Sequence, residues 1–162
     1  MKKNLLLLSV LLTALFSSAQ TPTDLFFSEY VEGSGNNKAL EIYNPTSQPI
    51  DLNSYYIARY SNGASVYTDG GITHLTGTIQ PYTTFVLVNG QTVTSGTSPA
   101  CSPELQAMAD QLDGTYPAPT YMNGNDAISL FKTPGGATPN GSNETAVDLI
   151  GQIGLGSAIS SE

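Results

Sequence analysis

Five residues near the start of the chain have side chains that suit a hard metal ion. They supply carboxylate and amide oxygens, the donors that Ca²⁺ prefers: Glu29, Glu32, Asn36, Asn37 and Glu41. If the segments that carry Glu29 and Glu41 pair as strands, these oxygens converge at one end of the pair, and we predict a Ca²⁺ site there. The alternative is structural, with Glu29 and Glu41 accepting hydrogen bonds from loop amides or from Lys38 and the loop between them being a solvated turn. The spacing lacks the D-x-[DN]-x-[DN]-G pattern of an EF-hand loop.

Nucleophilic catalysis has no support in the sequence. The chain has one histidine, His74, and one cysteine, Cys101, and no motif links either of them to an activating partner. A single cysteine cannot form an internal disulfide, so Cys101 either pairs with another molecule or is a buried apolar residue, and we favour burial. We predict that this chain alone is not an enzyme and that it has no cofactor apart from the Ca²⁺ alternative.

The N-terminal segment has the pattern of a secretory signal peptide. Lys2 and Lys3 precede an apolar run over residues 5–16, and the small residues 17–19 follow it. The apolar run is shorter than the ~20 residues that a membrane span needs. We predict a signal peptide over residues 1–19, a mature chain without a membrane span, and a secreted, extracellular or cell-surface location.

The mature chain is strongly acidic. Removal of residues 1–19 leaves 143 residues, with three basic and thirteen acidic side chains, a formal charge of −10. Such a surface repels phosphate backbones at long range, so we expect no direct binding of nucleic acid. A chain of this length suits one domain with its own core.

Short strands recur along the mature chain, separated by Gly, Asn and Pro. We predict strands at residues 25–31, 39–44, 55–61, 72–75, 84–88, 127–132 and 147–150. Several such strands with dense turns indicate an all-β sandwich or barrel. A Ser-Pro start and an apolar stripe predict one short helix over residues 103–112. The period-2 pattern predicts buried side chains at Leu40, Ile42, Ile57, Val86, Val88, Ile128, Leu130 and Leu149.

Tyrosines form a second candidate surface. Tyr55, Tyr56, Tyr60 and Tyr67 lie close together in the sequence, and Tyr116 and Tyr121 follow later. Exposed tyrosines stack on sugars or anchor protein interfaces, but neighbouring strand residues point to opposite faces, so at least one of Tyr55 and Tyr56 belongs to the core. The segment 123–126, Asn-Gly-Asn-Asp, is interpreted as a turn rather than a ligand site.

The order of several motifs resembles a known family. They are SEYVEG at residues 28–33, NNKALEIYN at 36–44, IDL at 50–52, FVLVN at 85–89, YMNGNDA at 121–127 and VDLIG at 147–151. Together they resemble the lamin tail domain, in a form found in bacterial secreted proteins. The resemblance implies an immunoglobulin-like β-sandwich over residues 25–152, with residues 153–162 as a linker or truncated end, and it supplies no catalytic residues.

Three functions follow from the resemblance and the composition. The first is a non-catalytic extracellular interaction or surface-attachment module, whose partner is a protein or a surface glycan. The second is the N-terminal accessory part of a secreted nuclease or related hydrolase whose catalytic domain is absent here. The third is a carbohydrate-binding or calcium-dependent adhesion domain.

Overall fold

The computed structural model describes residues 22–155, so the predicted signal peptide over residues 1–19 and the end of the chain from residue 156 lie outside the described residues. The strands of this part are β1 (Phe26–Glu32), β2 (Lys38–Tyr43), β3 (Ile50–Asp51), β4 (Tyr55–Tyr60), β5 (Ile72–His74), β6 (Thr78–Ile79), β7 (Thr84–Val88), β8 (Gln111–Leu112), β9 (Ala127–Lys132) and β10 (Thr145–Ile150). Its helices are α2 (Pro103–Gln106) and the 3₁₀ turns η1 (Leu52–Ser54), η2 (Ser61–Gly63), η3 (Pro119–Tyr121) and η4 (Pro134–Gly136).

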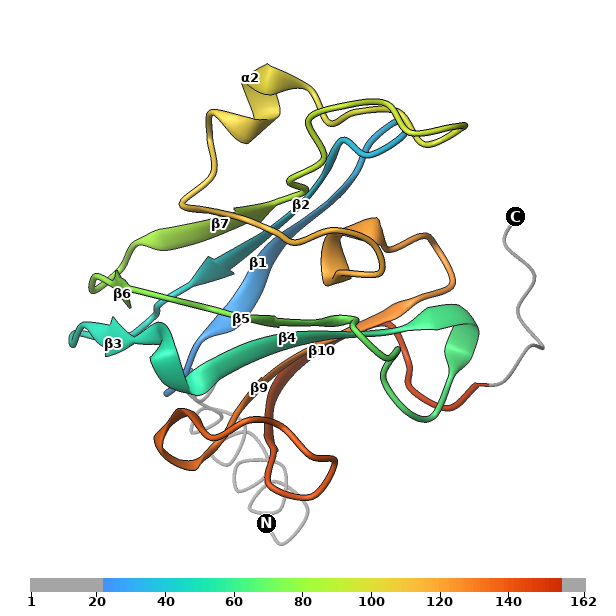
Figure 1. The fold of residues 1–162 in the computed structure, drawn as a ribbon. Helices are drawn as coiled ribbons and strands as arrows, with labels where there is room; N and C mark the ends of the chain where they lie inside the picture. Colours follow the sequence, from blue (N-terminus) through green and yellow to red (C-terminus); the bar gives the residue numbers. More distant parts are fainter. Residues whose placement is uncertain (1–21, 156–162) are drawn as a thin grey trace, which may run out of the picture.

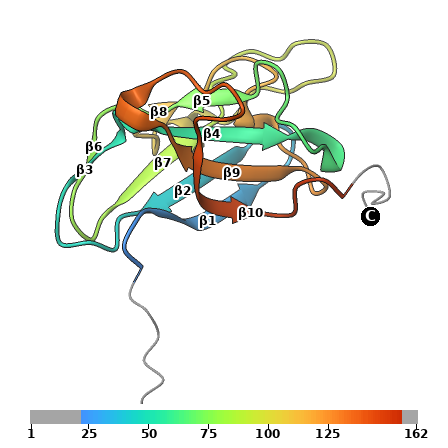
Figure 2. The ribbon, with the colours of Figure 1, turned by 90° about the horizontal axis from the view of Figure 1, so that it is seen from below.

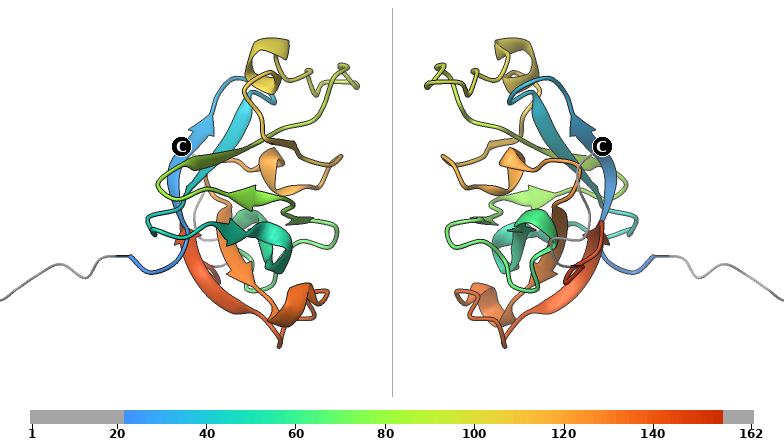
Figure 3. Two further views of the ribbon diagram at one scale, coloured as in Figure 1. Left: turned by 90° about the vertical axis from the view of Figure 1, so that its left-hand side faces the viewer. Right: turned by 90° about the vertical axis from the view of Figure 1, so that its right-hand side faces the viewer.

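Two four-stranded sheets form the layers of an immunoglobulin-like β-sandwich (Figure 1). The first sheet has the order β1-β2-β7-β8, and the second has the order β10-β9-β4-β5. All pairs are antiparallel except β7 and β8. In the side views, α2 lies at the end of the first sheet and η4 lies at the opposite end of the molecule, beside the second sheet (Figure 3). The predicted fold class is confirmed.

The core lies between the two sheets. Residues of period 2 on β2 and β7 face residues of period 2 on β4 and β9, and all are buried: Leu40, Ile42, Phe85, Leu87, Tyr55, Ile57, Ile128 and Leu130. Each of these four strands therefore buries one face in the core. Its other face is available to solvent, to α2 or to a ligand.

Side chains close the open sides of the sandwich. On one side, the Phe27 amide of β1 donates to the Asp148 carboxylate of β10 over 2.8 Å. On the other side, the side-chain Nε2 of Gln111 in β8 donates to the His74 carbonyl of β5 over 2.9 Å. These bonds occupy backbone groups that an open edge strand would offer to another chain.

The predicted helix over residues 103–112 is wrong in length. Ser102 caps it as expected, but α2 ends at Gln106. The following segment bonds to β7 instead, because the Asp110 amide donates to the Val86 carbonyl and the Asp113 amide donates to the Val88 carbonyl. Backbone groups used in this way are lost to a helix. Within residues 22–155 no helix is long and apolar enough to cross a membrane.

Two of the predicted core residues were assigned wrongly. Val86 is half-buried under the segment that follows α2, and Leu149 is 43% exposed. The pairing of β10 with β9 shifts register between Ala146 and Asp148. A bulge of this kind inserts one residue, so Leu149 moves to the outer face. The other six predicted core residues are buried.

Candidate functional site

The two glutamates on the paired strands do come together. Glu29 of β1 lies directly opposite Glu41 of β2. Both belong to the outer face of the first sheet, because Glu41 alternates with the buried Leu40 and Ile42. Ser28 Oγ donates to Glu41 Oε1 over 2.6 Å. Like charges opposite each other destabilise a strand pair, and a bound cation would relieve that repulsion. Of the five predicted Ca²⁺ ligands, this carboxylate pair is therefore the part that the fold supports best.

Glu32 lies apart from this carboxylate pair. It is opposite Lys38, whose side chain shares the inner face of β2 with Leu40. Its Oε1 is 4.0 Å from Lys38 Nζ, and its Oε2 accepts a hydrogen bond from Tyr30 Oη over 2.9 Å. Glu32 therefore lies beside a cation of its own sheet, away from Glu29 and Glu41.

The two asparagines fasten one loop to another. Asn36 Nδ2 donates to the Pro99 carbonyl over 2.6 Å, and Asn37 Oδ1 accepts from the Ser102 amide over 2.7 Å. Asn36 Nδ2 and Asn37 Oδ1 thus hold the β1–β2 loop against the segment before α2. The five candidate ligands occupy three different settings, and residues 22–155 contain no group of three or more His, Cys, Asp and Glu side chains placed to hold a metal ion. Calcium binding stays a prediction.

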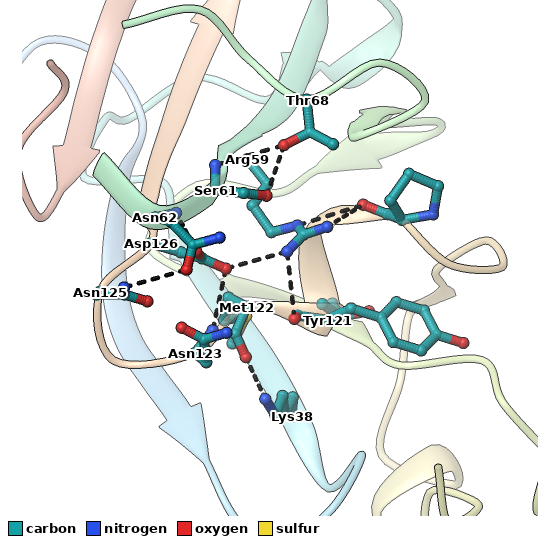
Figure 4. Close-up of polar contacts among 12 residues, drawn as sticks. Lys38, Arg59, Ser61, Asn62, Thr68, Tyr121, Met122, Asn123, Asn125 and Asp126 are labelled. Carbon is teal, nitrogen blue, oxygen red and sulfur yellow. Dashed lines mark hydrogen bonds and ion pairs between the residues drawn. The ribbon is translucent and has the colours of Figure 1, made fainter. Parts of the chain in front are cut away.

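A buried ion pair organises the loops at one end of the sandwich. Arg59 Nη1 lies 3.1 Å from Asp126 Oδ2, and the two side chains are 4% and 0% exposed. Asp126 also accepts hydrogen bonds from the amides of Asn62 and Asn123, at 2.8 and 3.1 Å (Figure 4). The Asn62 bond holds η2 in a left-handed backbone conformation that Asn tolerates. The segment 123–126 is therefore a turn that supports structure, as its sequence predicts.

The outer face of the second sheet carries an aromatic groove of about 490 Å³. Figure 2 shows the four strands of this sheet side by side, with β10 and β9 next to β4 and β5. The groove is lined by Tyr60, Ser65, Val66, Tyr67, Ser129, Phe131, Gly141, Glu144, Ala146 and Ile153. Strands β4, β9 and β10 supply its floor, and the segments after β4, before β10 and after β10 supply its walls.

The rings of the aromatic groove are held in fixed positions. Tyr60 and Tyr67 meet edge to face, with ring centroids 6.0 Å apart and planes at 76°. Phe131 is buried beside them and stacks on Tyr56. The Val66 side chain at the rim is 72% exposed. A rigid aromatic surface with an exposed apolar rim loses little conformational entropy when a ligand binds.

One carboxylate, that of Glu144, lies in the aromatic groove. Its Oε1 accepts hydrogen bonds from the Gly141 amide at 2.7 Å and from Tyr67 Oη at 3.3 Å. Burial raises the pKa of Glu144, but these hydrogen bonds outweigh burial and leave that pKa below its usual range. Burial and the nearby Glu144 charge raise the pKa values of Tyr60 and Tyr67. At neutral pH the groove therefore contains one negative charge and two neutral phenols.

The comparisons with known proteins agree with the fold. The family model described as Lamin Tail Domain matches residues 18–154, most of the chain. The chain belongs to the lamin tail domain family. Lamin tail domains are non-catalytic, immunoglobulin-like modules. No curated protein matches this lamin tail domain, so its aromatic groove has to be interpreted from its own residues.

The sequence identified part of this groove. Of the four clustered tyrosines that the sequence offers as a candidate surface, Tyr60 and Tyr67 are half-buried and line the groove, whereas Tyr55 and Tyr56 are buried. Phe131 and Glu144 were missed. The available signal for Phe131 was its alternation with the buried Leu130, which places it on the outer face of β9. No local pattern marks Glu144, because a loop far along the chain brings it to Tyr67.

Proposed function

We propose that this lamin tail domain is a non-catalytic, extracellular interaction module that contacts its partner through the aromatic groove. The observation that carries the proposal is the set of fixed aromatic rings next to an exposed valine on the outer face of the second sheet. Interfaces place their binding energy in such aromatic and apolar anchors. The partner is a protein or a surface glycan, and the signal-peptide pattern supports a location outside the cell.

The positions of His74 and Cys101 support a non-catalytic role for the chain. His74 stacks on Tyr56 of the second sheet, with ring centroids 4.5 Å apart, and its Nε2 hydrogen-bonds the Asn53 carbonyl at 2.7 Å. Cys101 is buried against Ala39 on the outer face of the first sheet. The two side chains thus belong to opposite faces of the sandwich and cannot act on one substrate atom.

A matched pair of variants tests the aromatic groove as the contact surface. Val66 in the groove and Val93 in a distant loop are 72% and 69% exposed. Peptides and glycans that bind the purified mature chain are first selected from a random peptide library and a glycan array. Burial of one valine contributes roughly 1.5–3 kcal/mol, so Val66→Ser is expected to weaken the selected ligands about tenfold or more. Val93→Ser leaves their affinity unchanged.

Two results would contradict this function. Equal losses of affinity from Val66→Ser and Val93→Ser would place the contact surface outside the groove. Degradation of DNA by the purified mature chain with Mg²⁺ or Ca²⁺ would contradict the non-catalytic role.

A further inference from the structure

We propose that the aromatic groove binds the positively charged side chain of a lysine or arginine presented by a protein partner. This inference rests on the proposed function and names the chemistry that the contact surface recognises. Three observations carry it: the arrangement of the rings, the position of the Glu144 carboxylate, and the distribution of charge over residues 22–155.

The rings of the aromatic groove suit a cation. Tyr60 and Tyr67 are close to perpendicular, and the buried Phe131 ring lies in the floor of the same groove. A cation within about 6 Å of a ring centroid is attracted by the negative face of the ring, and the attraction grows when the cation is removed from water. A groove of about 490 Å³ has room for a long side chain together with a neighbouring residue.

The Glu144 carboxylate supplies the counter-charge. The Tyr67 and Gly141 hydrogen bonds both end on Oε1 and orient the carboxylate within the groove. A charged hydrogen bond from an ammonium or guanidinium group is shorter and stronger than a neutral one. The apolar side chains of Val66 and Ile153 line the same groove and can pack against the aliphatic stem of lysine or arginine.

No basic side chain of residues 22–155 is available to neutralise Glu144 from within the molecule. This part of the chain has three basic residues and twelve acidic ones, a formal charge of −9. Each basic residue is already close to another acid: Lys38 to Glu32, Arg59 to Asp126, and Lys132 to Asp24. The excess negative charge attracts a basic partner at long range and increases its rate of association.

A peptide titration tests this assignment. The probe is the capped peptide Gly-Leu-Lys-Leu-Gly, added to the ¹⁵N-labelled mature chain and followed by NMR. We expect shifts at the amides of residues 64–67 and 141–146. Acetylation of the peptide lysine removes its charge and is expected to weaken binding at least tenfold. Glu144→Gln is expected to weaken the unmodified peptide at least fivefold.

The control is Glu104→Gln. Glu104 is exposed on α2, away from the aromatic groove, and its substitution changes the net charge by the same amount. It should change the affinity for the lysine peptide less than twofold. Equal effects of Glu104→Gln and Glu144→Gln would show a diffuse charge effect and overturn the assignment.

The cation assignment and the proposed function fail in different ways. If the acetylated peptide or a neutral glycan binds as tightly as the lysine peptide and Val66→Ser weakens it, the cation assignment is wrong and the aromatic groove remains the contact surface. If Val66→Ser and Val93→Ser have the same effect on every selected ligand, the proposed function itself is wrong.

Discussion

The buried carboxylate of Asp126 gives the sharpest stability prediction. Asp126 is 0% exposed at its side chain and holds Arg59, which is itself 4% exposed, at 3.1 Å. Arg59 Nη2 also donates to the Pro117 carbonyl at 3.0 Å, so the guanidinium stays fixed when the carboxylate is removed. The substitution Asp126→Ala therefore leaves a positive charge in the protein without its counter-ion.

The loss in the free energy of unfolding caused by Asp126→Ala follows from the groups that lose their hydrogen-bond or ion-pair partner. Breaking a buried ion pair by removing one side costs about 3–5 kcal/mol. The amides of Asn62 and Asn123 lose their acceptor as well, at about 1–3 kcal/mol for each one that water does not reach. Since neighbouring effects do not add, we expect a total loss of about 4–6 kcal/mol. Domains of this size are stable by only about 5–15 kcal/mol, so the variant lies close to unfolding.

Urea unfolding followed by tyrosine fluorescence measures this loss, because the chain has nine tyrosines and no tryptophan. Asp69→Ala is the matched control, since Asp69 is exposed in a turn, and its cost should be within ~0.5 kcal/mol of zero. The double variant Arg59→Met/Asp126→Leu removes both charges and should recover at least ~2 kcal/mol of the loss. A cost below ~1 kcal/mol for Asp126→Ala, or no recovery in the double variant, would refute the reasoning.

Three further predictions concern single side chains. Leu40→Ala should lower the free energy of unfolding, measured in urea, by about 2–5 kcal/mol. Leu149→Ala should lower it by less than ~1 kcal/mol, because Leu149 is 43% exposed. Equal losses would contradict the bulge in β10. Burial raises the pKa of Asp24, but hydrogen bonds led by that from Lys132 outweigh it and lower the pKa below its usual range. Because the folded pKa is the lower one, this stability is present above the unfolded pKa of about 3.9 and is lost as pH falls through the folded pKa. The Tm of Asp24→Asn should therefore fall less than that of the natural chain below about pH 4, and identical profiles would argue against this pairing. Burial also raises the pKa of the Cys101 thiol, so iodoacetamide should modify it at least ~10-fold faster in urea than in the folded chain; similar rates would mean that the thiol is accessible.

Much of the fold was predictable from the sequence, because strand faces are encoded locally. Each of the seven predicted strands is present, with ends within two residues of their predicted positions. Alternation at period 2 was enough to place Leu40, Ile42 and Ile57 in the core, since neighbouring side chains on a strand point to opposite faces. The short strands β3, β6 and β8 were missed, because two residues are too few to show any alternation.

The bulge in β10 and the early end of α2 depended on long-range pairing. Ala146 to Asp148 shifts register against β9, and this shift moves Leu149 outward although its local pattern indicates burial. Likewise, Asp110 leaves the predicted helix because β7 offers its backbone a partner. Neither event has a local signal, since the competing hydrogen bonds come from residues that are distant in the sequence.

The sequence by itself determined the acidic charge, the β-class and the family resemblance. Only the tertiary structure decided which polar residues meet. It separated Glu32 from Glu29 and Glu41 by placing them on opposite faces of one sheet. It also brought Glu144 to Tyr67 across a long stretch of chain. A residue type sets what a side chain can bind, but pairing register and loop closure set which side chains come within reach of each other, and both are properties of the whole chain.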